Sequence, residues 1–162
     1  MSRTRTRKST DRQRYLTDAG HRSGLEDKVA DQLARKGQPV CYELFKIKYD
    51  PPAKTRTYTP DFVLINGIIV ETKGRFVTAD RQKHKFIKAQ YPNLVIRFVF
   101  SNPNQRISKK SQTTYAMWCD QYGFEYAAKL IPDAWFKESL TPSQVEATKT
   151  VLGWTVPLKR KS

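Results

Sequence analysis

Two acidic residues and one lysine stand at the ends of a short apolar stretch. Asp61 precedes residues 62–70, and Glu71 and Lys73 follow them. Carboxylate oxygens are the ligands that hard divalent cations prefer, and a cation held by them can activate a water and polarise a phosphate. The chain carries 30 Lys and Arg against 15 Asp and Glu, and its net charge of +15 suits a polyanion. These features together predict a metal-dependent nuclease.

The apolar stretch must fold as a hairpin of one particular register for these side chains to meet. A two-residue turn would point Asp61 and Glu71 to opposite faces of the sheet. A three-residue loop over 65–67, with Gly67 in the left-handed conformation, instead places the two acids directly opposite each other. Their Cβ atoms would then lie about 4.5–5.5 Å apart, and Lys73 would lie on the same face. We therefore predict the three-residue loop.

The acid pair on its own is a weak signal, and other interpretations stay open. Asp after Pro often opens a turn, and charged residues at strand ends are usually solvated. A non-catalytic DNA-binding protein would explain the charge, but the acids would repel phosphate unless they bound a metal. A restriction-type or transposase-end nuclease would keep the metal site and cut a different target. Cleavage of a four-way junction, compared with cleavage of linear duplex of the same sequence, distinguishes these classes.

Length and composition predict a single soluble, intracellular domain. A chain of 162 residues with 38% hydrophobic residues can bury one modest core. No apolar run approaches the ~18 residues of a membrane span, and no signal peptide is visible. Cys41 and Cys119 have no metal-type spacing and are expected to be reduced, and His21 and His84 are too far apart to predict zinc.

The first predicted helix and strand precede the hairpin. Ser23 and Glu26 have capping-box spacing and begin a helix, with one apolar stripe, that ends before Gly37. Alternation of apolar residues predicts a strand over 40–49. Its phase changes at the Leu44–Phe45 step, which indicates a bulge or a change of partner.

The rest of the secondary structure follows from turn residues and periodicity. We predict a basic loop over 50–59, helices over 78–91, 113–122 and 132–137, a central strand over 94–100 and a short strand over 124–127. Trp118 is expected to lie in the core rather than to stack on a base.

Charge and polarity divide the chain into three parts. Residues 1–20 carry six Lys and Arg against two Asp, which predicts a disordered arm that folds onto a phosphate backbone. Residues 21–138 are the predicted nuclease domain. Residues 139–162 are predicted to be a mobile, basic C-terminal tail.

Several motifs occur together in one order and at characteristic spacings. They are Arg22–Val29, Tyr58–Phe62, Asn66-Gly67, Val70–Gly74, Asp80-Arg81, Arg97–Ser101 and Lys129–Pro132. In this order they resemble the endonuclease I family of the T-odd bacteriophages. The resemblance runs from about Arg22 to Glu138, and the first 20 residues match only in being basic.

The resemblance implies a fold, a substrate and an assembly. It implies an α/β fold with a restriction-endonuclease-like core, a mixed central sheet flanked by helices, and an intertwined, domain-swapped homodimer. Enzymes of that family resolve four-way (Holliday) junctions and branched DNA by phosphodiester hydrolysis with Mg²⁺ or Mn²⁺, leaving 5′-phosphate and 3′-hydroxyl ends. Such an enzyme would work in the host-cell cytoplasm.

The resemblance also assigns site residues. The four catalytic positions of the family fall on Glu26, Asp61, Glu71 and Lys73. We expect Asp61 and Glu71, with the Thr72 carbonyl, to bind one ion, and Glu26 with Asp61 to bind a second. Lys73 would orient the attacking water or stabilise charge on the phosphorane. Sequence alone makes Glu26 a helix-capping residue, whereas the family makes it a catalytic carboxylate donated by the other subunit.

Overall fold

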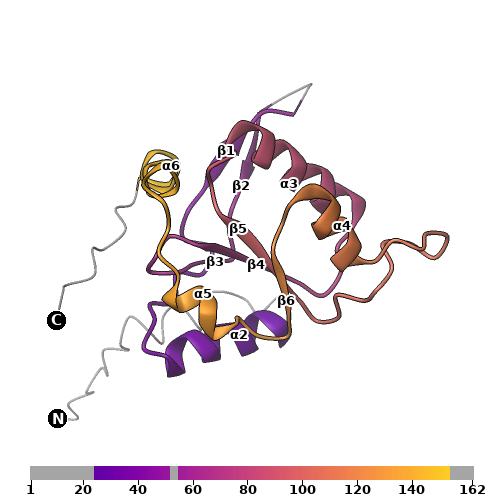
Figure 1. The fold of residues 1–162 in the computed structure, drawn as a ribbon, viewed down its shortest axis with the longest axis horizontal. Helices are drawn as coiled ribbons and strands as arrows, with labels where there is room; N and C mark the ends of the chain where they lie inside the picture. The colour runs from indigo at the N-terminus through magenta and orange to yellow at the C-terminus, as the bar shows by residue number, and fades with distance from the viewer. Residues whose placement is uncertain (1–23, 52–54, 154–162) are drawn as a thin grey trace, which may run out of the picture.

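The computed structural model describes residues 24–51 and 55–153 (Figure 1). The predictions for the basic arm 1–20, for the capping role of Ser23 and for residues 154–162 lie outside the described residues. Within the described part, no helix is long and apolar enough to cross a membrane.

A four-stranded mixed sheet forms the centre of the protein, in the order β3-β4-β5-β6. β3 (Phe62–Val63) runs antiparallel to β4 (Ile69–Lys73), whereas β5 (Ile96–Phe100) and β6 (Tyr126–Ala128) run parallel to β4. β5 has a partner on each side, and all five of its residues are buried. Burial on both faces explains its nearly continuous apolar sequence. The predicted mixed sheet and central strand are confirmed.

Helices cover both faces of this sheet (Figure 1). Side chains of α3 (Thr78–Gln90) and α4 (Tyr115–Tyr122) pack with Phe98 and Phe100 on one face. Those of α2 (Gly24–Arg35) and α5 (Asp133–Lys137) pack with Val70 and Val99 on the other, because successive strand residues point to opposite sides. Trp118 is buried in the first layer, as predicted. The helices predicted over 78–91, 113–122 and 132–137 all form.

Helix α2 forms where its apolar residues recur at helical spacing. Leu25, Val29 and Leu33 are buried on one stripe. The helix ends at Arg35, and the chain turns away at Gly37, whose φ of +65° is a conformation that glycine adopts without steric cost. The N–H of Gln38 then donates to the Leu33 carbonyl at 2.9 Å. Both predicted features, the stripe and the glycine stop, are confirmed.

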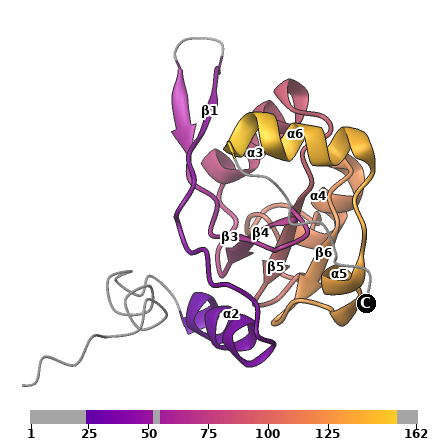
Figure 2. The ribbon, with the colours of Figure 1, turned by 90° about the vertical axis from the view of Figure 1, so that its left-hand side faces the viewer.

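The prediction of a strand over 40–49 is wrong for its first part. β1 contains only Ile47–Tyr49. The chain turns at Glu43, which has φ of +45° and donates its N–H to the Asp61 carbonyl at 3.0 Å. This turn is the physical reason why the alternation of apolar residues changes phase at the Leu44–Phe45 step. The predicted loop over 50–59 is also wrong for β2 (Arg56–Tyr58), which pairs antiparallel with β1 in a ribbon that extends from the body (Figure 2).

Two predictions are wrong for residues 142–152. One is that 139–162 is a mobile tail, and the other is that 132–137 is the last helix. Helix α6 (Pro142–Leu152) begins with a capping box between Thr141 and Gln144. Thr148 is fully buried, and Leu152 packs against the core. The Thr-Pro-Ser-Gln sequence that begins this helix is a recognisable start signal, which the tail interpretation overlooked.

Candidate active site

The hairpin that carries the candidate residues has the predicted register. Phe62 pairs with Val70, and the loop over 65–67 places Gly67 at φ of +96°. Residues with a Cβ rarely adopt this conformation, so the Gly fixes the loop type. One step beyond the Phe62–Val70 pair, Asp61 lies opposite Glu71.

The Glu71 carboxylate is buried, and each of its oxygens has its own neighbours. Oε2 accepts a hydrogen bond from the Tyr58 hydroxyl at 2.7 Å and lies 3.5 Å from the backbone N of Asp61. Oε1 lies 3.1 Å from Lys73 Nζ and 3.8 Å from His84 Nε2. Burial alone would raise the pKa of Glu71, but His84 and the neighbouring lysines outweigh burial and hold that pKa well below its usual value. Glu71 is therefore ionised at neutral pH.

Asp61 is the other member of the acid pair, and its environment acts in the opposite direction. Its Oδ2 accepts hydrogen bonds from the Thr72 backbone N–H at 2.8 Å and from the Thr72 hydroxyl at 2.9 Å. Burial, followed by the negative charge of Glu71, raises the pKa of Asp61 to about 8 despite these bonds and the charge of Lys73. Without a cation, the pair holds one negative charge and one proton at neutral pH.

Lys73 lies between two acids at the end of β4. Its Nζ is 3.1 Å from Glu71 Oε1 and 3.6 Å from Asp80 Oδ1 in the first turn of α3. Burial would lower the pKa of Lys73, but Glu71, Asp80 and Asp61 together raise it above its usual value. Lys73 is thus a fixed ammonium group, which can donate to an anionic oxygen.

Glu26 lies in the first turn of α2 and accepts a hydrogen bond from a tyrosine. The Tyr42 hydroxyl donates to Glu26 Oε2 at 2.7 Å, and the Tyr42 ring packs on Phe62 with centroids 5.4 Å apart. The pKa of Tyr42 is raised by burial first, then by Glu26, and more weakly by Glu43 and Asp61. Among the described residues, no group of three or more His, Cys, Asp or Glu could hold a metal ion. The single chain brings Asp61, Glu71, Thr72 and Lys73 together, while Glu26 forms a hydrogen bond with Tyr42.

The acid pair fits the chemistry of Mg²⁺ or Mn²⁺. Mg²⁺ is usually bound by one or two carboxylates, and waters and substrate phosphates complete its shell. The raised pKa of Asp61 comes first from burial and then from the nearby charge of Glu71, which Lys73 only partly offsets. Thr72 uses its N–H and hydroxyl to orient Asp61, and its carbonyl stays a predicted ligand.

Tyr58 and His84 are site residues that the sequence interpretation missed. His84 is fully buried, and its ring meets Tyr58 edge-on with centroids 5.0 Å apart. Within the part of the chain that the structure describes, neither ring nitrogen has a hydrogen-bond partner. Two signals could have found them. His84 lies three residues from both Arg81 and Ile87, which share its buried helical face, and Tyr58 immediately precedes Thr-Pro-Asp61.

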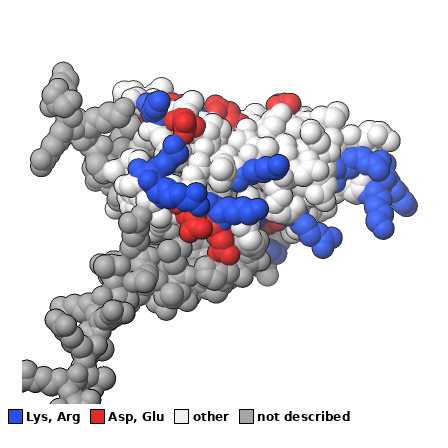
Figure 3. All heavy atoms as spheres, turned by 90° about the horizontal axis from the view of Figure 1, so that it is seen from below, with Lys and Arg blue, Asp and Glu red and all other residues white. Residues whose placement is uncertain are grey.

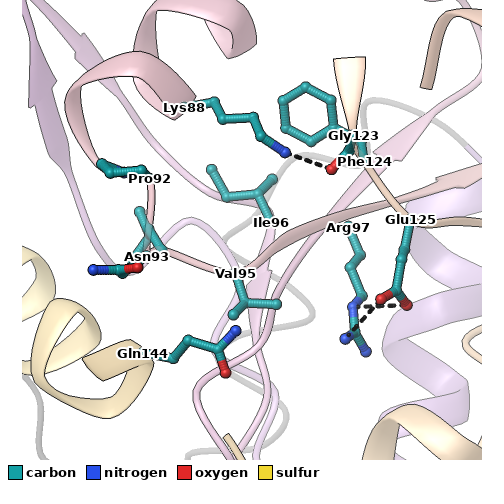
Figure 4. Close-up of a pocket in the computed structure, with 11 residues that line it drawn as sticks. Lys88, Pro92, Asn93, Val95, Ile96, Arg97, Gly123, Phe124, Glu125 and Gln144 are labelled. Carbon is teal, nitrogen blue, oxygen red and sulfur yellow. Dashed lines mark hydrogen bonds and ion pairs between the residues drawn. The ribbon is translucent and has the colours of Figure 1, made fainter. Parts of the chain in front are cut away.

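Another hollow, of about 170 Å³, lies at the opposite end of β5 and takes no part in this site (Figure 4). Its two cationic side chains are already engaged, because Lys88 donates to the Gly123 carbonyl and Arg97 pairs with Glu125 at 3.2 Å. Cys41 and Cys119 are free thiols, as predicted.

Fold and site together define a mixed α/β domain with two opposed carboxylates and a lysine at the end of one strand, in a strongly basic chain. The family described as phage endonuclease I matches residues 7–153. Endonuclease I of Escherichia phage T7 is 51% identical over 117 residues, which cover 72% of this chain and 78% of that protein. Endodeoxyribonuclease 1 of Enterobacteria phage T3 is 47% identical over 132 residues, which cover 82% and 87%.

The chain belongs to the phage endonuclease I family and is a nuclease. The family resemblance predicted from the motifs is confirmed. The match continues beyond Glu138 through α6, which agrees with the folded C-terminal helix seen here.

Proposed function

We propose that this nuclease resolves four-way junctions and branched DNA by metal-dependent hydrolysis that leaves 5′-phosphate and 3′-hydroxyl ends. The observation that carries the proposal is the opposed pair Asp61 and Glu71 beside Lys73, in a chain of net charge +15. Two buried acids hinder phosphate binding unless a cation joins them. The names of the related phage proteins, an endonuclease and an endodeoxyribonuclease, support DNA as the substrate. Such an enzyme would act in the cytoplasm of the host cell.

The acid pair would serve as the ligand set. Asp61 and Glu71, with the Thr72 carbonyl, would hold one Mg²⁺ or Mn²⁺ ion, and Glu26 with Asp61 would hold a second. A bound cation supplies Lewis-acid polarisation of the scissile phosphate. Asp61 would have to be ionised to serve as a ligand, and its pKa of about 8 belongs to the cation-free pair.

Two other side chains prepare the site for the reaction. The Tyr58 hydroxyl holds Oε2 of Glu71 and leaves Oε1 on the side of Lys73. The Lys73 ammonium, fixed by Glu71 and Asp80, would donate to a phosphate oxygen or to the attacking water. Charge that develops in the transition state is stabilised best by such a donor, because it needs no reorganisation.

We also propose a restriction-endonuclease-like core and an intertwined homodimer in which Glu26 is donated across the interface. In the single chain, α2 packs on its own sheet, and the Gln32 side chain forms hydrogen bonds of 2.8 and 2.9 Å with the backbone of Ile131. A swapped dimer would make the same contacts between two chains. A dimer also suits the task, since a junction is resolved by cutting two strands within one complex.

Mixed subunits test the donation of Glu26. Glu26→Ala and Glu71→Ala chains are refolded together, so that a heterodimer with composite sites has both lesions in one site and the other site intact. We expect these heterodimers to nick one strand without the paired cut. If the heterodimers nick neither strand, each site is contained within one chain.

The choice of substrate is tested by comparing a four-way junction with linear duplex of the same sequence in Mg²⁺. Faster cleavage of the junction supports the proposal. Equal cleavage of both would favour a restriction-type or transposase-end nuclease. Binding without cleavage in Mg²⁺ or Mn²⁺ would contradict the assignment of a catalytic site.

A further inference from the structure

The segment that joins β5 to α4 forms a basic projection, residues 101–114, which we call the prong. It extends from the body at the right of Figure 1, and Lys and Arg side chains cover this end of the molecule in Figure 3. Arg106, Lys109 and Lys110 are exposed. Residues 101–119 contain no Asp or Glu, so no acid within this stretch offsets their charge.

The prong is preorganised by its own backbone. Arg106 and Thr114 form an antiparallel bridge, and the Ile107 N–H donates to the Thr113 carbonyl at 2.9 Å. At the tip, Ser111 N–H donates to the Ser108 carbonyl at 3.3 Å, so Lys109 and Lys110 are the two central residues of a turn. The Ile107 side chain packs against the core. A surface held in this way has little backbone entropy to lose when it binds a partner.

The base of the prong is fastened to the catalytic strand. The Ser101 N–H donates to the carbonyl of Lys73 at 3.2 Å. The tip residue Lys109 lies eight residues further on, so it is at most about 29 Å from Ser101 even for a fully extended chain. One turn of duplex DNA is about 34–36 Å long. The prong tip and a phosphate at Lys73 are therefore close enough to contact one turn of the same duplex.

We propose that the prong binds the phosphate backbone of the duplex arm next to the cleaved strand. This inference rests on the proposed function and extends it to a separate contact surface. Lysines at a turn suit phosphate oxygens, which carry no sequence information, because a flexible ammonium needs no fixed geometry. The prong therefore adds affinity for any duplex arm, and the preference for a branch point arises elsewhere in the protein.

The test measures the salt dependence of binding for the variant Lys109→Ser/Lys110→Ser. Affinity for a four-way junction and for linear duplex is measured in EDTA at several salt concentrations. Loss of two phosphate contacts is expected to reduce the slope of log affinity against log salt by about 2 for both DNAs. Affinity at 0.1 M salt should fall on the order of tenfold or more.

A matched control removes the same charge from another face. Lys137 and Lys149 are exposed on α5 and α6, and Lys137→Ser/Lys149→Ser should keep the wild-type slope. Equal losses in both double variants would overturn the proposal, since charge alone would then explain them. A loss for the junction but not for duplex would also overturn it, because the prong would then contact the branch point.

Different results would contradict the proposed function and the role of the prong. Wild-type protein that neither prefers nor cuts a junction counts against the proposed function. Wild-type protein that does so, together with an unchanged slope for Lys109→Ser/Lys110→Ser, counts against the prong alone. Thermal unfolding of each variant checks that the fold is retained. The fold should be retained, because these side chains lie outside the core.

Discussion

Asp61→Asn is expected to stabilise the cation-free protein while it abolishes cleavage. The pKa of Asp61 rises from the ordinary value of 3.8 to about 8 on folding, because the carboxyl is buried beside Glu71. A group with a raised pKa binds its proton more tightly in the folded state. Its contribution to stability is complete below about pH 4 and is lost as the pH rises to about 8. Asn cannot ionise, so the variant has no such loss.

The size of the effect follows from the pKa shift. Within this window, each pH unit removes about 1.4 kcal/mol from the stability of the wild type relative to the variant. Between pH 5 and pH 7, the difference in unfolding free energy should therefore grow by about 3 kcal/mol. For a chain of this length, that corresponds to a change of roughly 6–12 °C in the Tm difference. Any loss from altered hydrogen bonds to Thr72 is independent of pH and cancels.

Thermal unfolding in EDTA at pH 5, 6, 7 and 8.5 measures this difference. Asp120→Asn removes an exposed carboxylate on α4 and is the matched control for the change of charge. The gap for Asp61→Asn should widen up to about pH 8 and then stay level. A gap that stays constant across the series would refute burial and repulsion by Glu71 as the state of the acid pair.

Three further predictions concern the site and the core. Glu71→Ala should abolish cleavage in Mg²⁺ while junction binding, measured by gel shift in EDTA, stays near wild type or becomes tighter; Mg²⁺-dependent cleavage by a clean preparation would contradict the ligand assignment. Tyr58→Phe removes the donor to Glu71 Oε2. The Mg²⁺ concentration for half-maximal cleavage should rise several-fold. An unchanged metal titration would show that Tyr58 does not position Glu71. Leu33→Ala, at a fully buried position of α2, should lower the unfolding free energy in urea by about 2–5 kcal/mol; a loss below about 1 kcal/mol would mean that α2 docks only weakly.

The geometry of the acid pair was predictable because it depends on local rules. Strand parity and the loop length around Gly67 decide whether Asp61 and Glu71 share a face, and all these residues lie within eleven positions. The central position of β5 was predictable for a similar reason, since a strand buried on both faces must be apolar throughout.

Most of the missed features depend on how one element packs against another, which strand parity and turn rules do not decide. The Tyr58 hydroxyl reaches Glu71 because β2 leads into the hairpin, and His84 reaches it from α3. The turn at Glu43 is imposed by its bond to the Asp61 carbonyl, and the sequence shows only a change of phase there. Helix α6 is a different case, because its capping box was present in the sequence and was overlooked.

The continuous segment 61–100 has a consequence for the order in which the protein opens. It contains β3, β4, α3 and β5, and with them Asp61, Glu71 and Lys73. β4 and β5 are hydrogen-bonded on both sides, whereas α2 packs through one apolar face and through side-chain hydrogen bonds that include those of Gln32 and Glu26. Amide hydrogen exchange should therefore be slowest in β4 and β5 and faster in α2. Glu26 can then leave by local unfolding while the acid pair and its lysine stay assembled.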